Sequence, residues 1–408
     1  MTDTPVPERL KIKTVNEISK EDIRELTERF SDSETVVTLM MPMETAGAET
    51  RKNPIVFKNA LNEACEKLEQ AGGYSRPLKQ QFREVDDLCE NPVHEFWQHQ
   101  EAGLLVFLDG NEDIRGYRLP VPIGPDVRIG KSPHLTPLHR FLNPVRRLVL
   151  VLDLNETRLF EATRWKVDEI ELKDIPTSLE EAMRFDDPEK SLQFRSVSDS
   201  NLRGEGGGEA AFHGHGVTTE TNRNRKKQRF FEMISADIAK HFPDRNTPLV
   251  ILGPDAERAR YREVNHYEHL SDDEIDLNPS HLEKAELHRH ITDHVAKVEE
   301  AESSSALARL EDHVGTDTSK GATTVEEVVE AALGGRIETL FVRAGARQYG
   351  TVDLETFRTE PHDSAEEGDT ELVAFATNQA AMTNASIRVL DDGATLPGDS
   401  PVAAILRY

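Results

Sequence analysis

The chain has 408 residues, which is long for a single hydrophobic core, so we expect two or three domains. Its 49 lysines and arginines against 75 aspartates and glutamates give a net charge of −26. This balance excludes a generally basic nucleic-acid-binding protein and a protein that binds anionic membrane surfaces. No stretch approaches the roughly 20 apolar residues of a membrane span.

Two cysteines, Cys65 and Cys89, are too few for a disulfide scaffold or a four-cysteine zinc site, which favours a reducing compartment. The first residues lack the apolar segment of a signal peptide. We therefore expect a cytoplasmic protein.

Residues 15–142 predict a first α/β domain. Residues 34–41 form a buried strand, and Asn53, as a capping side chain, with Pro54 starts a helix that runs to Gln70. A second helix follows over about residues 77–88, and residues 103–110 form another buried strand. Prolines 120 and 122 place the next extended piece, residues 114–123, at a sheet edge.

Residues 145–270 predict a second α/β domain. The runs 146–154 and 158–163 form a hairpin, residues 166–172 a third strand, and residues 248–254 a short buried strand. Between them stand a glycine-rich loop, residues 204–218, and a helix over residues 221–242. Phe230, Ile234, Ile238 and Phe242 recur every four residues, with Phe231 beside them, and give this helix one apolar face. Its first two turns are polar on all sides, so we expect them to project and to carry the loop at their tip.

Residues 275–408 predict a third α/β domain. Ser280 and Glu283 form a capping box for an acidic helix from His281 to about Glu300, and the serines at 303–305 break it. Further helices at 325–333 and 371–382 alternate with strands at 337–343, 386–390 and 401–408. The fold class is thus three consecutive α/β domains.

Five positive charges lie within seven residues at the start of the projecting helix: Arg223, Arg225, Lys226, Lys227 and Arg229. The ordinary explanation is a solvated helix face. However, no acid is interleaved among them as it would be in a helix of i,i+4 ion pairs, which favours contact with a phosphate backbone. No aromatic residue is interleaved either, so structured RNA fits better than stacked single strands.

The sequence offers little for catalysis or metal binding. The glycine loop lacks the Lys-Ser/Thr pair of a phosphate-binding loop. It also lacks the flanking strand and helix that a dinucleotide-binding fingerprint requires. The ordinary explanation is therefore a surface loop without a role. His213 with His215, and His290 with His294, have no third ligand of obvious type nearby, and no GxSxG is present. Cys65 fits a helix core position. We expect no metal, no cofactor and no catalytic residue.

The segment His213, Gly214, His215, Gly216, Val217 and Thr218, ahead of a basic helix, resembles the His-Gly-x-Gly-Gly-Gln loop of archaeal and eukaryotic class-one peptide-release factors. With the hairpin before it and the strand at 248–254 after it, the chain is similar to the bacterial and archaeal release-factor-like families, which are related to Pelota and Balon. This resemblance implies a ribonuclease-H-like middle domain and a last domain similar to kink-turn-binding ribosomal proteins. It also implies that residues 213–218 and the five cations contact ribosomal RNA.

Val217 and Thr218 stand where that family has its second glycine and its glutamine. Threonine supplies a hydroxyl instead of an amide, and valine restricts the backbone. The sequence therefore favours a ribosome-associated factor that binds stalled or idle ribosomes near the tRNA sites without peptide release. By resemblance, a translational GTPase such as EF-Tu would deliver it, and neither membrane nor DNA is a partner. Two alternatives stay open: hydrolysis of the peptidyl-tRNA ester, with Thr218 or His215 assisting a water, and an interaction protein unrelated to ribosomes.

Overall fold

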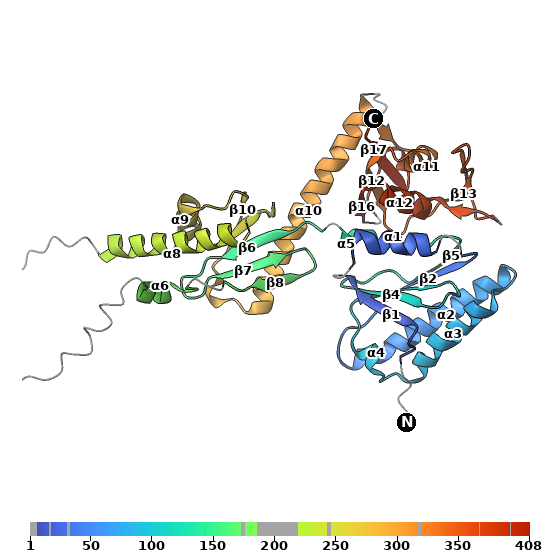
Figure 1. Cartoon of the computed structure of the whole chain (residues 1–408), viewed down its shortest axis with the longest axis horizontal. Coiled ribbons are helices and arrows are strands. Elements are labelled where there is room, and N and C mark those ends of the chain that lie inside the picture. The colour runs from blue at the N-terminus through green and yellow to red at the C-terminus, as the bar shows by residue number, and fades with distance from the viewer. Residues whose placement is uncertain are drawn as a thin grey trace, which may run out of the picture. The chain divides into compact units, whose positions relative to one another are not determined.

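The computed structural model describes residues 6–15, 18–30, 33–142, 144–172, 176–185, 219–242, 246–316, 320–366, 368–391 and 393–408 (Figure 1). The chain divides into two compact units. The first contains residues 1–144 and 302–408, and the second, here called the middle unit, contains residues 145–301. Mixed α/β structure with several sheets confirms the predicted fold class, while the division into three domains stays a prediction.

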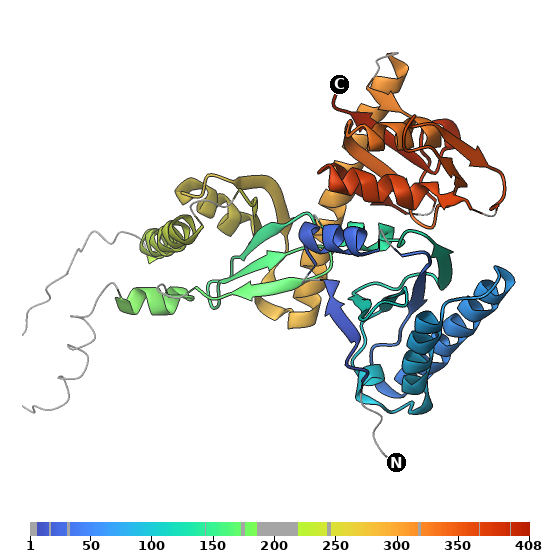
Figure 2. The same ribbon diagram turned by 45° about the vertical axis from the view of Figure 1, so that its right-hand side comes forward.

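The N-terminal part of the first unit is a five-stranded sheet in the order β1-β4-β3-β2-β5, with β1 parallel to β4 and the other pairs antiparallel. Helices α2 and α3 lie side by side on one face of this sheet (Figures 1 and 2). The apolar faces of these helices pack with the strands into one core that includes Phe57, Phe82 and Trp97. The elements are β1 (Leu10–Thr14), α1 (Lys20–Arg29), β2 (Val36–Pro42), η2 (Gly47–Lys52), α2 (Asn53–Gln70), α3 (Arg76–Asp86), η3 (Asp87–Glu90), α4 (Glu95–Gln98), β3 (Gly103–Leu108), β4 (Ile114–Leu119), β5 (Asp126–Gly130) and α5 (Thr136–Leu142).

Two expectations for this part are wrong. Asn53 does not cap α2: the cap position is Lys52, and the buried Asn53 side chain instead donates to the carbonyls of Glu44 and Trp97 and accepts from the Glu44 N–H. The strand at residues 114–119 is not an edge strand, because β4 lies between β1 and β3. Pro120 and Pro122 fall after its last residue, where they cost no ladder hydrogen bond.

The middle unit is a five-stranded sheet in the order β10-β9-β6-β7-β8. The predicted hairpin is confirmed as antiparallel β6 and β7, and the buried strand is confirmed as β9, which runs parallel to β6. Helices α8 and α9 pack on one face of the sheet, and Leu287, Ile291 and Val295 of α10 pack on the other. The elements are β6 (Arg147–Val151), β7 (Arg158–Ala162), β8 (Val167–Ile170), α6 (Leu179–Phe185), α8 (Thr219–His241), β9 (Leu249–Gly253), α9 (Asp255–Val264), β10 (Leu270–Asp276), η4 (Pro279–His281) and α10 (Lys284–Gly315).

Helix α10 is longer than expected. It passes through the serines at 303–305 and ends at Gly315, and its residues from Glu302 onwards belong to the first unit. Serine is only a weak helix breaker, and the next turns are fixed by burial of Ala306 and Leu310 against Phe341 and Ile405. Tertiary packing therefore overrides the local signal.

The C-terminal part of the first unit carries a four-stranded sheet in the order β11-β17-β12-β16 and a small antiparallel sheet in the order β14-β13-β15. The predicted strands at 337–343 and 386–390 are confirmed as a parallel pair, and the terminal strand is confirmed as antiparallel to the first of them. Among the described residues, no helix combines the length and apolar character that a bilayer crossing requires. The elements are β11 (Gly321–Ala322), α11 (Val325–Leu333), β12 (Ile337–Arg343), β13 (Tyr349–Val352), β14 (Thr359–His362), β15 (Thr370–Glu371), α12 (Leu372–Met382), β16 (Ser386–Leu390), η5 (Pro397–Asp399) and β17 (Val402–Leu406).

Within the first unit, α1 and α5 pack against α12 and β16. His139 of α5 lies near this contact, 3% exposed, beside Ala381 and Met382, and neither of its ring nitrogens has a hydrogen-bond partner in the described part of the chain. Burial lowers the pKa of His139 from 6.5 to about 3, so the ring is neutral in the folded protein.

We predict that His139 makes the first unit sensitive to acid. The folded pKa lies below the unfolded one, so stability is complete above pH 6.5 and is lost as the pH falls towards 3, by up to about 1.4 kcal/mol per pH unit. His139→Leu should flatten the dependence of the urea midpoint on pH between about 6.5 and 4.5. His99→Leu, at an exposed position of the same unit, is the control. An unchanged slope in His139→Leu would contradict the prediction.

Candidate functional site

Helix α8 is anchored by its C-terminal half. Phe230, Phe231, Ile234 and Ile238 are fully buried, and they pack with Tyr261 of α9 and with Leu150 and Ile251 of the sheet. The predicted apolar face of this helix is thus confirmed. Fully burying side chains of this size contributes about 1.5–3 kcal/mol each, so this segment has one fixed position on the sheet.

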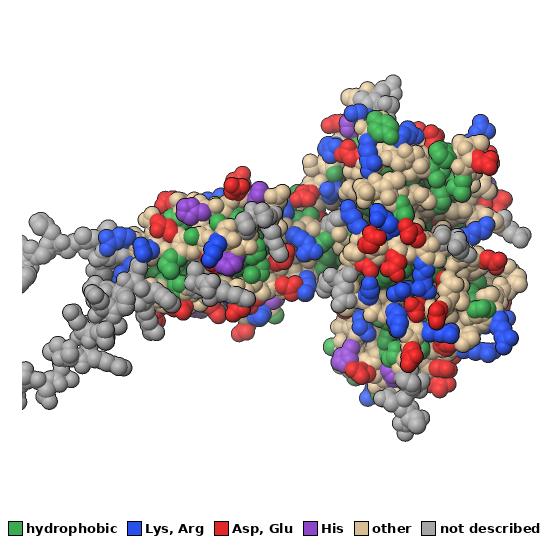
Figure 3. Space-filling model, in the orientation of Figure 1, with side chains coloured by type: hydrophobic (Ala, Val, Ile, Leu, Met, Phe, Trp, Pro, Cys, Tyr) green, Lys and Arg blue, Asp and Glu red, His purple; other side chains and the backbone are tan. Residues whose placement is uncertain are grey.

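The N-terminal turns of α8 have no such anchor. Arg223, Asn224, Arg225 and Lys226 are exposed. Figure 3 shows lysine and arginine side chains gathered at this end of the middle unit, where the ribbon of α8 runs beyond the strands (Figure 1). Arg229 is also exposed, one turn further along. The exposed cations lie close to the helix N-terminus. Because the partial charge there is also positive, it does not stabilise them.

Lys227 differs from its neighbours. Its ammonium lies 2.5 Å from Oε1 of Glu257 in α9, and the two side chains are only 14% and 12% exposed. Arg260 donates to the other oxygen of Glu257 and also to the side-chain oxygen of Asn224. Lys227 and Glu257 therefore join the basic end of α8 to α9 inside the middle unit.

Residues 213–218 lie outside the described residues. The structure therefore gives no geometry for His213, Gly214, His215, Gly216, Val217 or Thr218. Of the predicted RNA-contacting residues, it places the five cations on α8.

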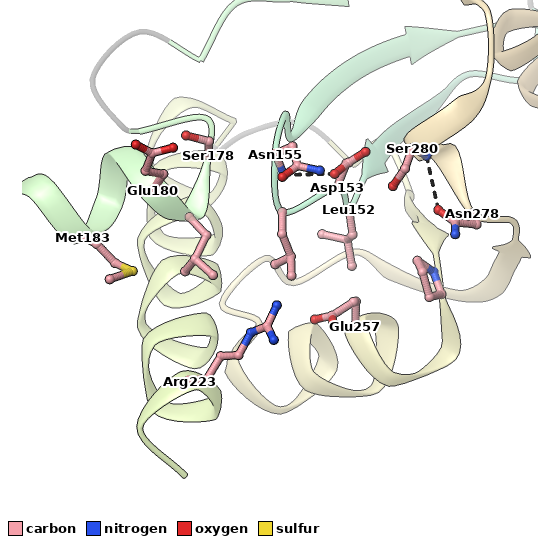
Figure 4. Close-up of a pocket in the computed structure, with 13 residues that line it drawn as sticks. Leu152, Asp153, Asn155, Ser178, Glu180, Met183, Arg223, Glu257, Asn278 and Ser280 are labelled. Atoms are coloured by element: carbon pink, nitrogen blue, oxygen red, sulfur yellow. Dashed lines mark hydrogen bonds between the residues drawn. The ribbon is translucent and has the colours of Figure 1, made fainter. Parts of the chain in front are cut away.

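A pocket of about 530 Å³ lies at the carboxyl ends of the parallel strands in the middle unit (Figure 4). From β6 the chain turns to β7, and from β9 it passes through α9 to β10 on the opposite side of the sheet. Neighbouring parallel strands whose connections diverge in this way leave a crevice, which is where open α/β sheets bind ligands. This pocket is not predicted by the sequence, although polar residues follow each of the apolar strands that border it.

The pocket is lined by polar side chains from five segments. Asp153 and Asn155 follow β6, Asn278 and Ser280 follow β10, and Ser178 and Glu180 lie at the start of α6. Arg223 of α8 and Glu257 of α9 lie on its other side (Figure 4). Asp153 and Asn278 also accept backbone N–H groups two residues onward, from Asn155 and Ser280, so their positions are fixed by local turns.

This sheet and the helices on its two faces are similar to one known family. Residues 148–296 match the model of bacterial archaeo-eukaryotic release factor family 7. The matched segment begins in β6 and ends in α10, so it contains the sheet, the anchored helix with its exposed cations, and the pocket. The release-factor resemblance is thereby confirmed for the middle unit.

Solved structures give weaker likenesses. An archaeal translation termination factor, aRF1, is 12% identical, with a TM-score of 0.24 over 97% of this chain and 99% of that chain. Archaeoglobus fulgidus Pelota is 15% identical, with a TM-score of 0.33 over 75% and 79% of the two chains. A ribosome-bound archaeal Pelota is 12% identical, with a TM-score of 0.37 over 95% and 94%. The family match, and not these likenesses, supports the assignment. No curated protein matches the chain.

The middle unit carries His290 and His294 on α10, two of the candidate metal ligands in the sequence. Burial lowers the pKa of His294, and its Nε2 atom has no hydrogen-bond partner in the described part of the chain. Within the described ranges, no three His, Cys, Asp or Glu side chains are grouped to hold a metal ion.

We predict that Lys227 stabilises the middle unit, whereas its neighbour Lys226 does not. Lys227→Met leaves the buried Glu257 carboxylate without its closest partner and should lower the free energy of unfolding by roughly 1–3 kcal/mol. The matched variant Lys226→Met removes an exposed cation and should change it by less than about 0.5 kcal/mol. Chemical denaturation of the two variants measures the difference. Equal effects would contradict the prediction.

Proposed function

We propose that this chain is a ribosome-associated translation factor of the release-factor type, which binds stalled or idle ribosomes through the exposed cations of α8 and does not release the nascent peptide. The observation that carries the proposal is the exposure of Arg223, Arg225 and Lys226 on a helix that is anchored in a release factor family 7 domain. The partner is ribosomal RNA, and delivery by a translational GTPase and action in the cytoplasm belong to the same proposal.

Electrostatics supports a local contact rather than a general one. With a net charge of −26, most of the protein surface is repelled by a polyanion. RNA must therefore bind at a local surface whose charge is positive. The basic end of α8 combines exposed guanidinium and ammonium groups with a helix N-terminus, and both favour phosphate. Lys227 contributes by holding this end to α9, because its own charge is neutralised by Glu257.

The glycine loop at residues 204–218 precedes this helix directly in the sequence, so a helix that contacts RNA would bring the loop with it. We propose that residues 213–216 approach RNA closely, as glycine-rich backbone allows. Val217 and Thr218 replace the glycine and glutamine of peptide-release factors, which supports binding without hydrolysis.

Charge reversal tests the RNA contact. We expect Arg225→Glu with Lys226→Glu to weaken co-sedimentation with ribosomes about tenfold or more, and to reduce the slope of log affinity against log salt by roughly two. The matched control reverses Lys284 and Arg289, two exposed cations on α10 of the same unit. If both double variants pellet like the native chain, RNA contact through α8 is wrong. If co-sedimentation survives ribonuclease treatment of an extract, a partner other than RNA holds the protein.

The absence of peptide release has its own test. Incubation with ribosomes that carry labelled peptidyl-tRNA should liberate no more peptide than buffer does, because no glutamine stands at position 218 to place a water. A class-one release factor on its stop codon serves as the positive control. Peptide release that disappears in Thr218→Ala would establish the alternative, an esterase with a different loop chemistry.

A further inference from the structure

A second cleft, of about 410 Å³, lies within the first unit between its N-terminal sheet and its C-terminal sheet. One wall is the loop over residues 121–125 with α5, and the other is the turn after β12 with Val389 of β16. This volume is in the range of small-molecule sites, which commonly lie where two substructures meet. Nothing in the proposed ribosomal function uses this cleft.

The floor of the cleft is an arginine cluster built around one carboxylate. Arg128 of β5 donates from Nε to Asp126 across 3.0 Å, and Arg347 donates to the other oxygen of the same carboxylate. The Arg128 side chain is only 6% exposed and is held further by the carbonyls of Gly345 and Ala346, at 3.2 and 3.3 Å. Its guanidinium is therefore rigid and desolvated, a condition in which a charge attracts a counter-ion strongly.

The charges of this cluster do not balance. Two guanidinium groups share Asp126, and the next carboxylate, Glu371, is 3.7 Å from Arg128 and is used to accept three backbone N–H groups. Burial raises the pKa of Glu371, which weakens it as a counter-charge. His134, 3.2 Å from Arg128, adds no negative charge, because burial and the charges of Arg128 and Arg347 hold its pKa well below 6.5.

A third arginine stands at the rim. Arg140 of α5 donates to Asp391 across 2.9 Å, but the Asp391 side chain is 82% exposed, so solvent screens its charge. Arg347 also keeps 38% of its side chain exposed. The Arg140 side chain itself is 26% exposed, so two partly exposed guanidinium groups lie above the buried Arg128. Among the residues that line this cleft, Asp126 is the one carboxylate.

The remaining walls are largely apolar. Met40, Ile123, Phe141 and Val389 contribute hydrocarbon surface. Thr136, which also lines the cleft, is 3% exposed, and its hydroxyl has no hydrogen-bond partner in the part of the chain that the structure describes. A buried hydroxyl without a partner is costly, and a bound polar group would satisfy it.

We propose that this cleft binds a small molecule that carries an anionic group, carboxylate or phosphate, on an apolar body. The arginines take the anion, since guanidinium groups match the planar, bidentate geometry of both oxyanions. The apolar walls cover the rest of the molecule. Because α5 and β5 form one side and the turn after β12 the other, the ligand joins the two parts of the first unit.

The test uses the full chain with three probes of one size: benzoate, phenyl phosphate and neutral benzyl alcohol. Calorimetric titration should show binding of at least one anion at about 1 mM or tighter, and no binding of benzyl alcohol. The preferred anion identifies the head group as carboxylate or phosphate. Arg347→Gln should weaken binding about tenfold or more, while Arg309→Gln, which removes an exposed arginine paired with Glu338 in the same unit, should leave it unchanged.

A second variant separates binding from folding. Gly124 lines the cleft, and an added Cβ there meets no atom within 4 Å apart from its chain neighbours. Gly124→Trp should therefore keep the thermal midpoint of the native chain and abolish anion binding. The proposal is overturned if neither anion binds the native chain, if benzyl alcohol binds as tightly as the anions, or if Arg347→Gln and Gly124→Trp both bind normally.

Discussion

The burial of the apolar face of α8 on the sheet of the middle unit is the interaction on which the rest of the site depends. Phe230, Phe231, Ile234 and Ile238 leave no freedom in how this helix lies against β6 and β9. Because a helix is stiff over a few turns, the same contacts fix the direction of the turns that precede Phe230. The exposed cations therefore occupy a defined place on the domain.

The junction of α8 with α9 connects this basic end to the pocket. Glu257 accepts Lys227 and Arg260 and also lines the pocket, and Arg223 reaches the same pocket from the exposed turn of α8. One carboxylate thus takes part in helix packing and in the lining of a site. A ligand in the pocket and a phosphate on the helix would both act on Arg223, so occupation of one site would alter the electrostatics of the other. This proximity follows from the place of α8 beside the switch point of the sheet, where the paths of the chain from β6 and β9 diverge.

The sequence predicts those structural features that a local pattern determines, but not those that depend on contacts between distant segments. The period of four in α8 and the apolar runs of β6, β9 and β12 predicted elements that the structure confirms, because burial of one face determines them. Asn53 has the sequence position of a helix cap, yet its amide forms hydrogen bonds with Glu44 and Trp97. Trp97 is 44 positions away, so no local pattern could predict this contact. Lys227 has the same sequence neighbourhood as Lys226 and differs only through Glu257 of another helix. The pocket and the arginine cluster are also formed by segments that are distant in the sequence. The sequence shows which polar and charged residues are present, but not that they lie together in space.

The RNA contact proposed above poses a specific electrostatic problem for an acidic protein, and the exposed cations of α8 offer an answer to it. At a net charge of −26, long-range repulsion opposes every encounter, but the ionic strength of a cell limits that repulsion to about 8 Å from the surface. The exposed cations at the start of α8 would meet phosphate first, and counter-ion release would then favour the contact. Repulsion of the remaining surface would reject unspecific polyanions that cannot receive the helix in a crevice. In the proposed contact, the acidic composition would provide selectivity and the short basic segment would provide attraction.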